Sequence, residues 1–309
     1  MSRAPDDDAV TQCLALLLQS PPGQRKNVLM DVQGILSTYL TADEVAARAR
    51  SVLEQHAHEQ LLQVPIQLDG QKDEAILCSS AKMDDEYIHP RLPCRFTYDH
   101  VQETIGEVTA CPKPTDAKER LRAAVDEKLS QYVYEYYHTG MSLTFAQGSV
   151  AAESAEPTQN EDGNDSLGTH PASDVPFTLT LHIVGNKYNL RNFWAGRWRS
   201  TYVVDVNART FSHAQIQIQT HYFENGNVQM HGTCQPSLPT LIDTEDLPDA
   251  ILSAICAYEQ AYQGQLCEAV SRLRDSAFKA LRRTLPITRQ KIDWDKVVSY
   301  KLGSELANK

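Results

Sequence analysis

The sequence predicts an α+β protein with an N-terminal helical bundle, a five-stranded antiparallel sheet crossed by a long C-terminal helix, and an amphipathic C-terminal tail. Three observations support this fold class: helical periodicity at both ends of the chain, alternating apolar and polar residues between them, and a change of charge near the C-terminus. The chain has 309 residues, of which 41% are hydrophobic and 22% charged, so it can bury the core of one or two globular domains.

The first segment, residues 1–62, is expected to form a small bundle of three short helices. Apolar residues recur at helical spacing over residues 10–18 and again over residues 28–36, and a Pro-Pro-Gly turn separates the two runs. A third helix is expected from Thr41, which forms a capping box with Glu44 three residues later.

The next two segments are 63–118, expected to be mixed short strands and loops, and 119–247, expected to be a helix plus an antiparallel sheet. The helix is expected to begin at about Thr115. Four tyrosines near its end allow two interpretations: a platform on which bases stack, or a helix end packed on a sheet, and the second is the commoner arrangement. These tyrosines are Tyr132, Tyr134, Tyr136 and Tyr137.

Five runs with β-branched or aromatic alternation predict the five strands of the sheet. In one run, Ile216 and Ile218 alternate with glutamines, which gives the strand one apolar and one polar face, as is typical of antiparallel sheets. Asn225-Gly226 predicts a tight hairpin turn, and the short links predict a meander. The runs are MSLTFAQGSV, PFTLTLHIVGN, WRSTYVVDVN, HAQIQIQTHYFEN and GNVQMHG.

An acidic insert, residues 151–175, separates the first two of these runs. It holds six acidic residues, no Lys or Arg and almost no apolar residue, so we expect a disordered loop. A calcium-binding loop is rejected, because Leu167 stands where the sharp turn needs glycine and Ser173 where a bidentate glutamate belongs.

The long helix is expected over residues 248–285. Pro248 suits a first helical turn, and apolar residues then recur every three or four positions until Pro286 ends the pattern. At 1.5 Å per residue the helix would be roughly 57 Å long. Such a length exceeds one small core, so the helix is expected to cross the sheet and also to meet a second chain.

The basic and amphipathic tail, residues 286–309, ends a chain that is otherwise acidic. The net charge is −11, yet residues 272–309 hold ten Lys or Arg against four Asp or Glu. Two interpretations stay open: a docked terminal helix with a solvated charged end, or a mobile amphipathic arm that binds an acidic partner. The apolar stripe of the tail includes Trp294, Val298 and Leu302 at helical spacing.

No sequence pattern supports an enzyme. A Gly-rich phosphate loop, a G-x-S-x-G motif and an H-E-x-x-H motif are all missing, and we expect no cofactor and no metal. Seven scattered cysteines without a C-x-x-C pair indicate reduced thiols and a cytoplasmic protein. The net acidity argues against nucleic acid as a partner.

Two stretches resemble the alpha subunit family of F-actin-capping protein. They are FWAGRWRS at 193–200 and KALRRTLPITRQKIDW at 279–294, both long, gapless and rich in Trp and Arg. Weaker matches at PPGQRKNVLMDV, HYFENGNVQ and SYKLG extend the resemblance to nearly the whole chain. The insert at 151–175 departs from the family pattern. We interpret FWAGRWRS as a structural motif.

The resemblance implies a heterodimer with a capping protein beta subunit, in which the two sheets join and the long helices cross antiparallel. It implies binding to the barbed end of the actin filament, which blocks subunit addition and loss independently of calcium, in the cytoplasmic actin cytoskeleton. Phosphoinositides and capping-protein regulators are further implied partners. The alternative is a non-capping regulatory or scaffold subunit of an actin-related complex. The implied actin-binding residues are Lys279, Arg283, Arg289, Trp294, Val298 and Leu302.

Overall fold

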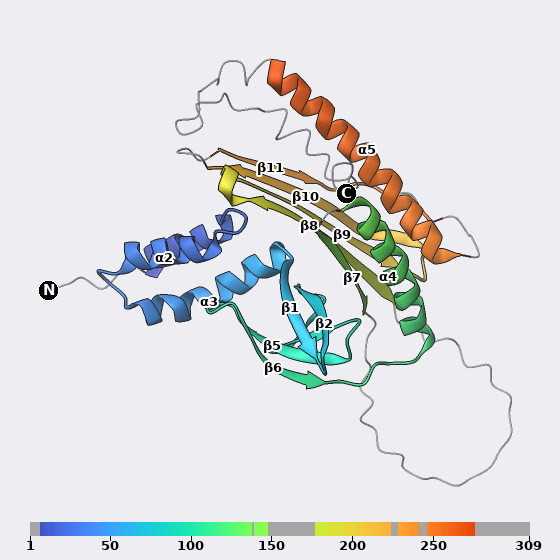
Figure 1. The fold of residues 1–309 in the computed structure, drawn as a ribbon, viewed down its shortest axis with the longest axis horizontal. Helices are drawn as coiled ribbons and strands as arrows, with labels where there is room; N and C mark the ends of the chain where they lie inside the picture. Colours follow the sequence, from blue (N-terminus) through green and yellow to red (C-terminus); the bar gives the residue numbers. More distant parts are fainter. Residues whose placement is uncertain are drawn as a thin grey trace, which may run out of the picture.

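The computed structural model describes residues 7–137, 139–147, 177–223, 228–238, 240–241 and 246–275. Several predictions fall outside these residues: the acidic insert at 151–175, the Asn225-Gly226 turn, the long helix beyond Asp275, and the tail at 286–309. The described residues confirm the α+β class, with helices at the N-terminal end, a five-stranded antiparallel sheet and a long helix packed on it (Figure 1). The division of the chain into five segments stays a prediction.

The N-terminal helices form as expected and share a core of their own. The capping box is confirmed: the backbone nitrogen of Glu44 donates to Thr41 Oγ1 at 3.3 Å, and the backbone nitrogen of Thr41 donates to Glu44 Oε2 at 2.8 Å. These two bonds satisfy donors that a helix start would otherwise leave free. The helices are α1 (Asp7–Ala15), the 3₁₀ turn η1 (Leu16–Gln19), α2 (Arg25–Leu36) and α3 (Ala42–Glu59).

The strands that follow form two small antiparallel sheets, β1-β2 and β3-β4-β5-β6. Asp69 and Gly70 join β1 to β2 with positive φ angles of 48° and 83°, the backbone that a two-residue hairpin with native twist requires. The core of these sheets includes Met141, Leu143 and Phe145 of the main sheet. The strands are β1 (Leu62–Leu68), β2 (Gln71–Leu77), β3 (Lys82–Met83), β4 (Glu86–His89), β5 (Cys94–Asp99) and β6 (Thr104–Ala110).

The main sheet is an antiparallel meander in the order β11-β10-β9-β8-β7, as the alternating runs predict. The helix before it begins two residues later than expected, because the side chain of Asp116 caps it by accepting a bond of 2.8 Å from the backbone nitrogen of Glu119. These elements are α4 (Ala117–Tyr136), β7 (Gly140–Gln147), β8 (Thr178–Asn189), the 3₁₀ turn η2 (Leu190–Asn192), β9 (Trp194–Asp205), β10 (Thr210–Tyr222) and β11 (Val228–Cys234).

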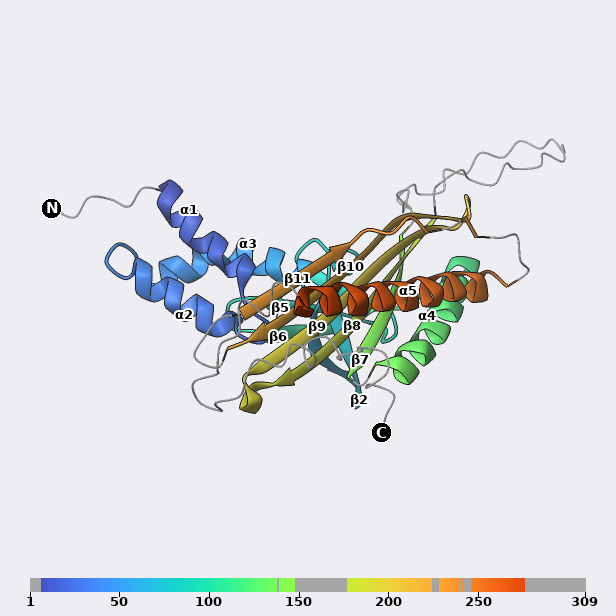
Figure 2. The same cartoon turned by 90° about the horizontal axis from the view of Figure 1, so that it is seen from above.

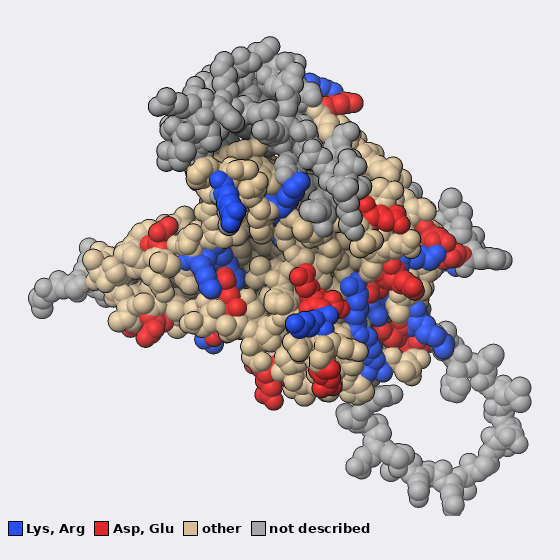
Figure 3. All heavy atoms as spheres, viewed as in Figure 1, with Lys and Arg blue, Asp and Glu red and all other residues tan. Residues whose placement is uncertain are grey.

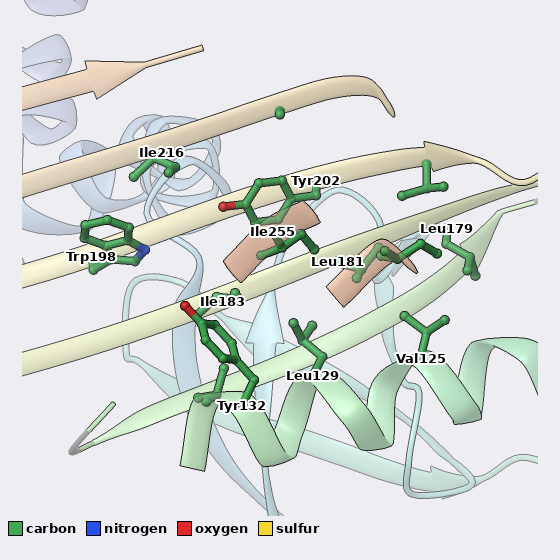
Figure 4. Packing of buried hydrophobic residues seen from close by; sticks show 14 of the residues in the cluster. Val125, Leu129, Tyr132, Leu179, Leu181, Ile183, Trp198, Tyr202, Ile216 and Ile255 are labelled. Carbon is green, nitrogen blue, oxygen red and sulfur yellow. The ribbon is translucent and has the colours of Figure 1, made fainter. Parts of the chain in front are cut away.

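The two faces of the main sheet carry different layers. The long helix α5 (Leu247–Asp275) and α4 pack on one face, where they form the largest core with β8, β9 and β10 (Figures 1 and 4). The small sheets pack on the other face, and Figure 2 shows α5 running across the strands of the sheet. The large buried side chains of the first core include Leu129, Leu181, Ile183, Trp198, Tyr202 and Ile255.

A buried charged group fixes α4 to the edge of the sheet. Asp126 of α4 receives a bond of 2.7 Å from Arg91 Nε and one of 3.0 Å from the backbone nitrogen of Thr144 in β7. Arg122, one turn earlier, donates to the carbonyl of Thr144 at 3.1 Å. These charge-assisted bonds set the angle of α4 on the sheet and thereby place its last turn beside α5.

Candidate functional site

The residues that the sequence nominates for actin binding lie outside the described residues. They are Lys279, Arg283, Arg289, Trp294, Val298 and Leu302. Lys279 follows the last described residue of α5, Asp275, by four positions. The structure therefore describes the scaffold that carries these residues, and the candidate site within the described part is the surface formed by α5 and the sheet edge beside it.

The tyrosines near the end of α4 divide between two environments. Tyr132 and Tyr137 are 7% and 3% exposed and pack into the core, which is the arrangement favoured from the sequence. Tyr134 is 74% exposed and Tyr136 is 40% exposed. Two of the four side chains thus belong to the packing of α4 against α5, and the other two face outward.

One buried carboxylate, that of Glu259, holds α5 on the sheet. Its side chain is fully buried and accepts four hydroxyl hydrogen bonds, two on each oxygen. Tyr132 and Tyr137 donate to Oε2 at 2.8 and 2.7 Å, and Ser200 and Tyr202 of β9 both donate to Oε1 at 2.8 Å. Because an ionised carboxylate accepts only, four donors match its capacity and compensate its burial.

The tyrosines around Glu259 are held in their neutral, donating form. Burial, followed by the charge of Glu259, raises the pKa of Tyr132, Tyr137 and Tyr202 above the usual range. The indole nitrogen of Trp198 donates to Ser200 Oγ and so orients that hydroxyl. The network joins three elements, α4, β9 and α5, at one point under the helix.

Edge strand β11 lies close to the middle of α5. The hydroxyl of Tyr258 is 2.9 Å from Cys234 Sγ, and the hydroxyl of Tyr262 lies 3.4 Å from the position that a Cβ on Gly232 would occupy. Strand β11 pairs with β10 on one side, and no other strand in the described ranges pairs with its outer side. The outer edge of β11 therefore presents backbone groups that another strand could pair with.

The exposed residues in the middle of α5, from position 253 to position 265, are uncharged, and most of them are small. Ala257 and Ala261 are exposed at a spacing of four residues, followed by Gly264 one turn later. A Cβ at Gly264 would meet no atom within 4 Å. At Ala257, Ala261 and Gly264 another helix could approach closely, because these residues carry a short side chain or none; Gln260 and Gln265 lie beside them on the exposed surface.

Sequence analysis did not identify Glu259, although a signal was present. The apolar stripe of the long helix includes Ile255, and a residue four positions later lies on the same side of a helix. Glu259 occupies that position, which indicates a carboxylate on the buried side. The neighbouring Tyr258 also fits the apolar stripe, so the spacing alone does not distinguish the two positions. Tyr258 is half-buried and Glu259 is the fully buried residue.

The described residues offer no cluster of three or more His, Cys, Asp or Glu that could hold a metal ion. Within the same part of the chain, no helix has both the length and the hydropathy needed to cross a membrane. None of the seven cysteines, all of which lie in the described residues, forms a disulfide bond. Figure 3 shows acidic and basic side chains of the described residues interspersed over the visible face.

The outer edge of β11 and the exposed face of α5 are both surfaces on which another protein chain could pack. The described part of the chain therefore has the features of a protein-binding subunit. Comparison with known proteins identifies the particular group. The chain belongs to the F-actin capping protein alpha subunit family, whose model matches residues 13–305. This is a family of non-enzymatic actin-binding proteins.

Relatives from distant organisms match over almost their full length. The F-actin-capping protein subunit alpha of Gibberella zeae is 28% identical over 290 residues, covering 94% of this chain and 93% of the relative. That of Dictyostelium discoideum is 28% identical over 314 residues, covering 98% and 99%. A solved structure, the homodimeric actin capping protein alpha subunit from Plasmodium berghei, shares the fold with a TM-score of 0.62 at 21% identity, covering 91% and 98%.

Proposed function

We propose that this chain is the alpha subunit of a heterodimeric actin-capping protein that binds the barbed end of the actin filament and blocks subunit addition and loss, independently of calcium. The observation that carries the proposal is the family match over residues 13–305, which spans the scaffold and the C-terminal motif at 279–294. In this proposal the protein is cytoplasmic and associated with the actin cytoskeleton.

The surface beside α5 supports a beta subunit as the partner. Among the described strands, none pairs with the outer edge of β11, and the exposed small residues of α5 leave room for a second helix. A partner with its own sheet and long helix would cover both features at once. The Plasmodium relative is described as a homodimer, so the composition of the complex is part of the test.

The basic residues Lys279, Arg283 and Arg289 would bind the acidic surface of actin, with the apolar stripe of Trp294, Val298 and Leu302 as a second contact. Phosphoinositide head groups would compete for the same basic residues, since they offer the same negative charge. In this proposal, residues 286–309 are the basic and amphipathic arm that carries Arg289 and the apolar stripe.

The experiment that tests this function is co-expression with a beta subunit, followed by elongation of actin from filament seeds. Arrest of barbed-end growth by nanomolar heterodimer is the expected result. A stable heterodimer that leaves elongation unchanged would instead support the alternative, a regulatory or scaffold subunit of an actin-related complex.

We expect the chain to be unstable without a partner subunit. The edge of β11 and the outward face of α5 would then stay exposed, and an exposed edge pairs with other chains. Expressed by itself, the chain should aggregate or give little soluble protein, whereas co-expression with a beta subunit should recover it. Size-exclusion chromatography with light scattering distinguishes these cases. A monodisperse monomer with a sharp unfolding transition, or a stable homodimer, would contradict the prediction.

We expect the acidic insert to be dispensable for assembly and capping. Gln147 and Thr178 are directly paired between β7 and β8, so the ends of the connection are held together by the sheet. Deletion of residues 153–174 leaves eight residues to join them, and the loop-closure free energy changes by only about 1 kcal/mol. Thermal unfolding and the seeded elongation assay should match those of the wild type. A Gly-Ser segment of equal length is the control, and loss of capping in the deletion variant would assign the insert a function.

A further inference from the structure

The polar face of the main sheet contains a cavity of about 150 Å³, between the end of α3 and strands β9, β10 and β11. This face lies opposite α5, so the cavity is separate from the packing around Glu259. Its lining is rich in hydrogen-bond donors and includes no Asp or Glu among the described residues. The polar side chains that matter here are Arg197, Arg199, Gln217, Gln219, His231 and Thr233.

Arg197 is a buried cation for which the described part of the chain supplies no partner. Its side chain lines the cavity and the residue is 5% exposed. It makes no hydrogen bond or ion pair with the described residues, and burial, followed by the charge of Arg199, lowers its pKa to about 9. An unpaired buried charge is costly, so an anionic ligand at this position would be strongly favoured.

Arg199 adds a second positive charge on the same face of β9, two residues further along the strand. Within the described residues, its donors reach neutral oxygens: the carbonyls of Gln60, Gly185 and Trp198, and Oδ1 of Asn186 at 2.8 Å. Burial lowers its pKa as well. The cavity therefore holds two guanidinium groups without a carboxylate from the described residues.

The histidines near the cavity are kept neutral by the same charges. Burial, then Arg197, lowers the pKa of His56 to about 3, with smaller contributions from Arg25 and Arg199. Burial, then Arg197, also lowers the pKa of His231, whose Nε2 lies 3.2 Å from Gln219 Nε2. Arg25, by contrast, has its own partner, Glu103, at 2.7 Å. The electrostatic environment of the cavity is thus positive and uncompensated.

We propose that this cavity is a binding site for one phosphate group, held by the guanidinium of Arg197 with the amide and hydroxyl donors of Gln217, Gln219 and Thr233. A guanidinium presents parallel N–H groups that match two oxygens of a phosphate or carboxylate. Two uncompensated arginines favour the phosphate, because it carries up to two negative charges and a carboxylate carries one. The residues proposed to hold the phosphate come from β9, β10 and β11.

The test is thermal unfolding of the full chain, in complex with its beta subunit or by itself if that form is stable, in inorganic phosphate and in chloride at equal ionic strength. A ligand that binds the folded state raises the unfolding temperature in a saturable way. We expect this rise for the wild type and for the control variant Arg191→Gln, which removes an exposed arginine of the η2 turn that does not line the cavity. We expect no saturable rise for Arg197→Gln, only the weak general effect of phosphate on any protein.

Without phosphate, Arg197→Gln should unfold at the same temperature as the wild type or higher, because it removes a buried unpaired charge. An equal rise in all three proteins would overturn the proposal, since the effect would not involve the cavity. A strong loss of stability in Arg197→Gln, together with no response of the wild type to phosphate, would also overturn it. That result would show that Arg197 already pairs with a carboxylate of the partner subunit.

A second measurement keeps the proposal testable if Arg197→Gln does not fold. Arg197→Lys keeps the charge and loses the planar fork, so its affinity for phosphate should fall by about tenfold. In the wild type, nuclear magnetic resonance should show the pKa of His231 rising when phosphate replaces chloride, because the bound anion offsets the charge of Arg197. An unchanged pKa of His231 at a phosphate concentration that raises the unfolding temperature would overturn the assignment of the site.

Discussion

Replacing Glu259 by alanine is expected to lower the free energy of unfolding by about 4 kcal/mol, among the largest losses of any single substitution in this chain. Four hydroxyl groups would lose their shared acceptor, and a cavity would open where α4, β9 and α5 meet. Hydrogen bonds to a charged group contribute about 1.5–3 kcal/mol each, and they act here as one network, so their losses do not add.

Chemical denaturation of the assembled protein measures this loss, with Glu268→Ala as the matched control. Glu268 lies on the same helix, is exposed, and pairs with the exposed Arg272 one turn away, so its removal should change stability by less than about 0.5 kcal/mol. Glu259→Gln should fall between the two, because an amide oxygen still accepts from two of the hydroxyls. A Glu259→Ala protein that unfolds at wild-type denaturant concentration would show that α5 is held by its apolar contacts alone.

Reversal of the charge at Lys279, Arg283 and Arg289 to glutamate is expected to weaken barbed-end capping by about 100-fold or more. Each charge at the rim of an interface contributes about 1 kcal/mol, and reversal turns attraction into repulsion. Association should slow most, because these charges steer the encounter with an acidic filament. The rate for the wild type should fall as salt rises, and the rate for the variant should not.

The matched control reverses three exposed basic residues of the described part, Lys72, Arg120 and Arg191, and so changes the net charge by the same amount. This control should cap nearly as well as the wild type, and neither triple variant should lose stability of the heterodimer. Filament elongation from seeds at several salt concentrations measures both effects. A folded Lys279/Arg283/Arg289 variant that stops elongation with wild-type kinetics at low salt would refute the assignment of these residues to the actin contact.

The FWAGRWRS stretch shows which features of β9 the sequence predicts and which it does not. The predicted strand WRSTYVVDVN begins at Trp198, whereas β9 begins four residues earlier, at Trp194, and contains the buried Trp198, in agreement with a structural role. The alternation along the strand places Arg197 and Arg199 on the opposite face, but the sequence does not reveal that this face is covered. Burial of the two arginines depends on the end of α3, more than a hundred residues earlier in the chain.

The sequence by itself determined the type and order of the elements, because the signals for these are local. The capping box at Thr41 and Glu44, the proline in the first turn of α5 and the period of two in β10 each act within a few residues. The short links from β8 to β11 likewise determined the antiparallel order of these strands, since neighbouring strands joined by a short turn must run in opposite directions.

Only the tertiary structure decided which polar residues are buried and what they contact. The hydroxyl groups that donate to Glu259 belong to residues of α4 and β9 that lie between 57 and 127 positions away in the chain. The two small sheets likewise arise from strand pairings that the short β-like runs did not specify. Tyr132 and Tyr134 are two residues apart on one helix, yet one is buried and the other exposed. The physical reason is that the cost of burying a charge or a hydroxyl depends on the groups that surround it in space, and these groups come from distant parts of the chain.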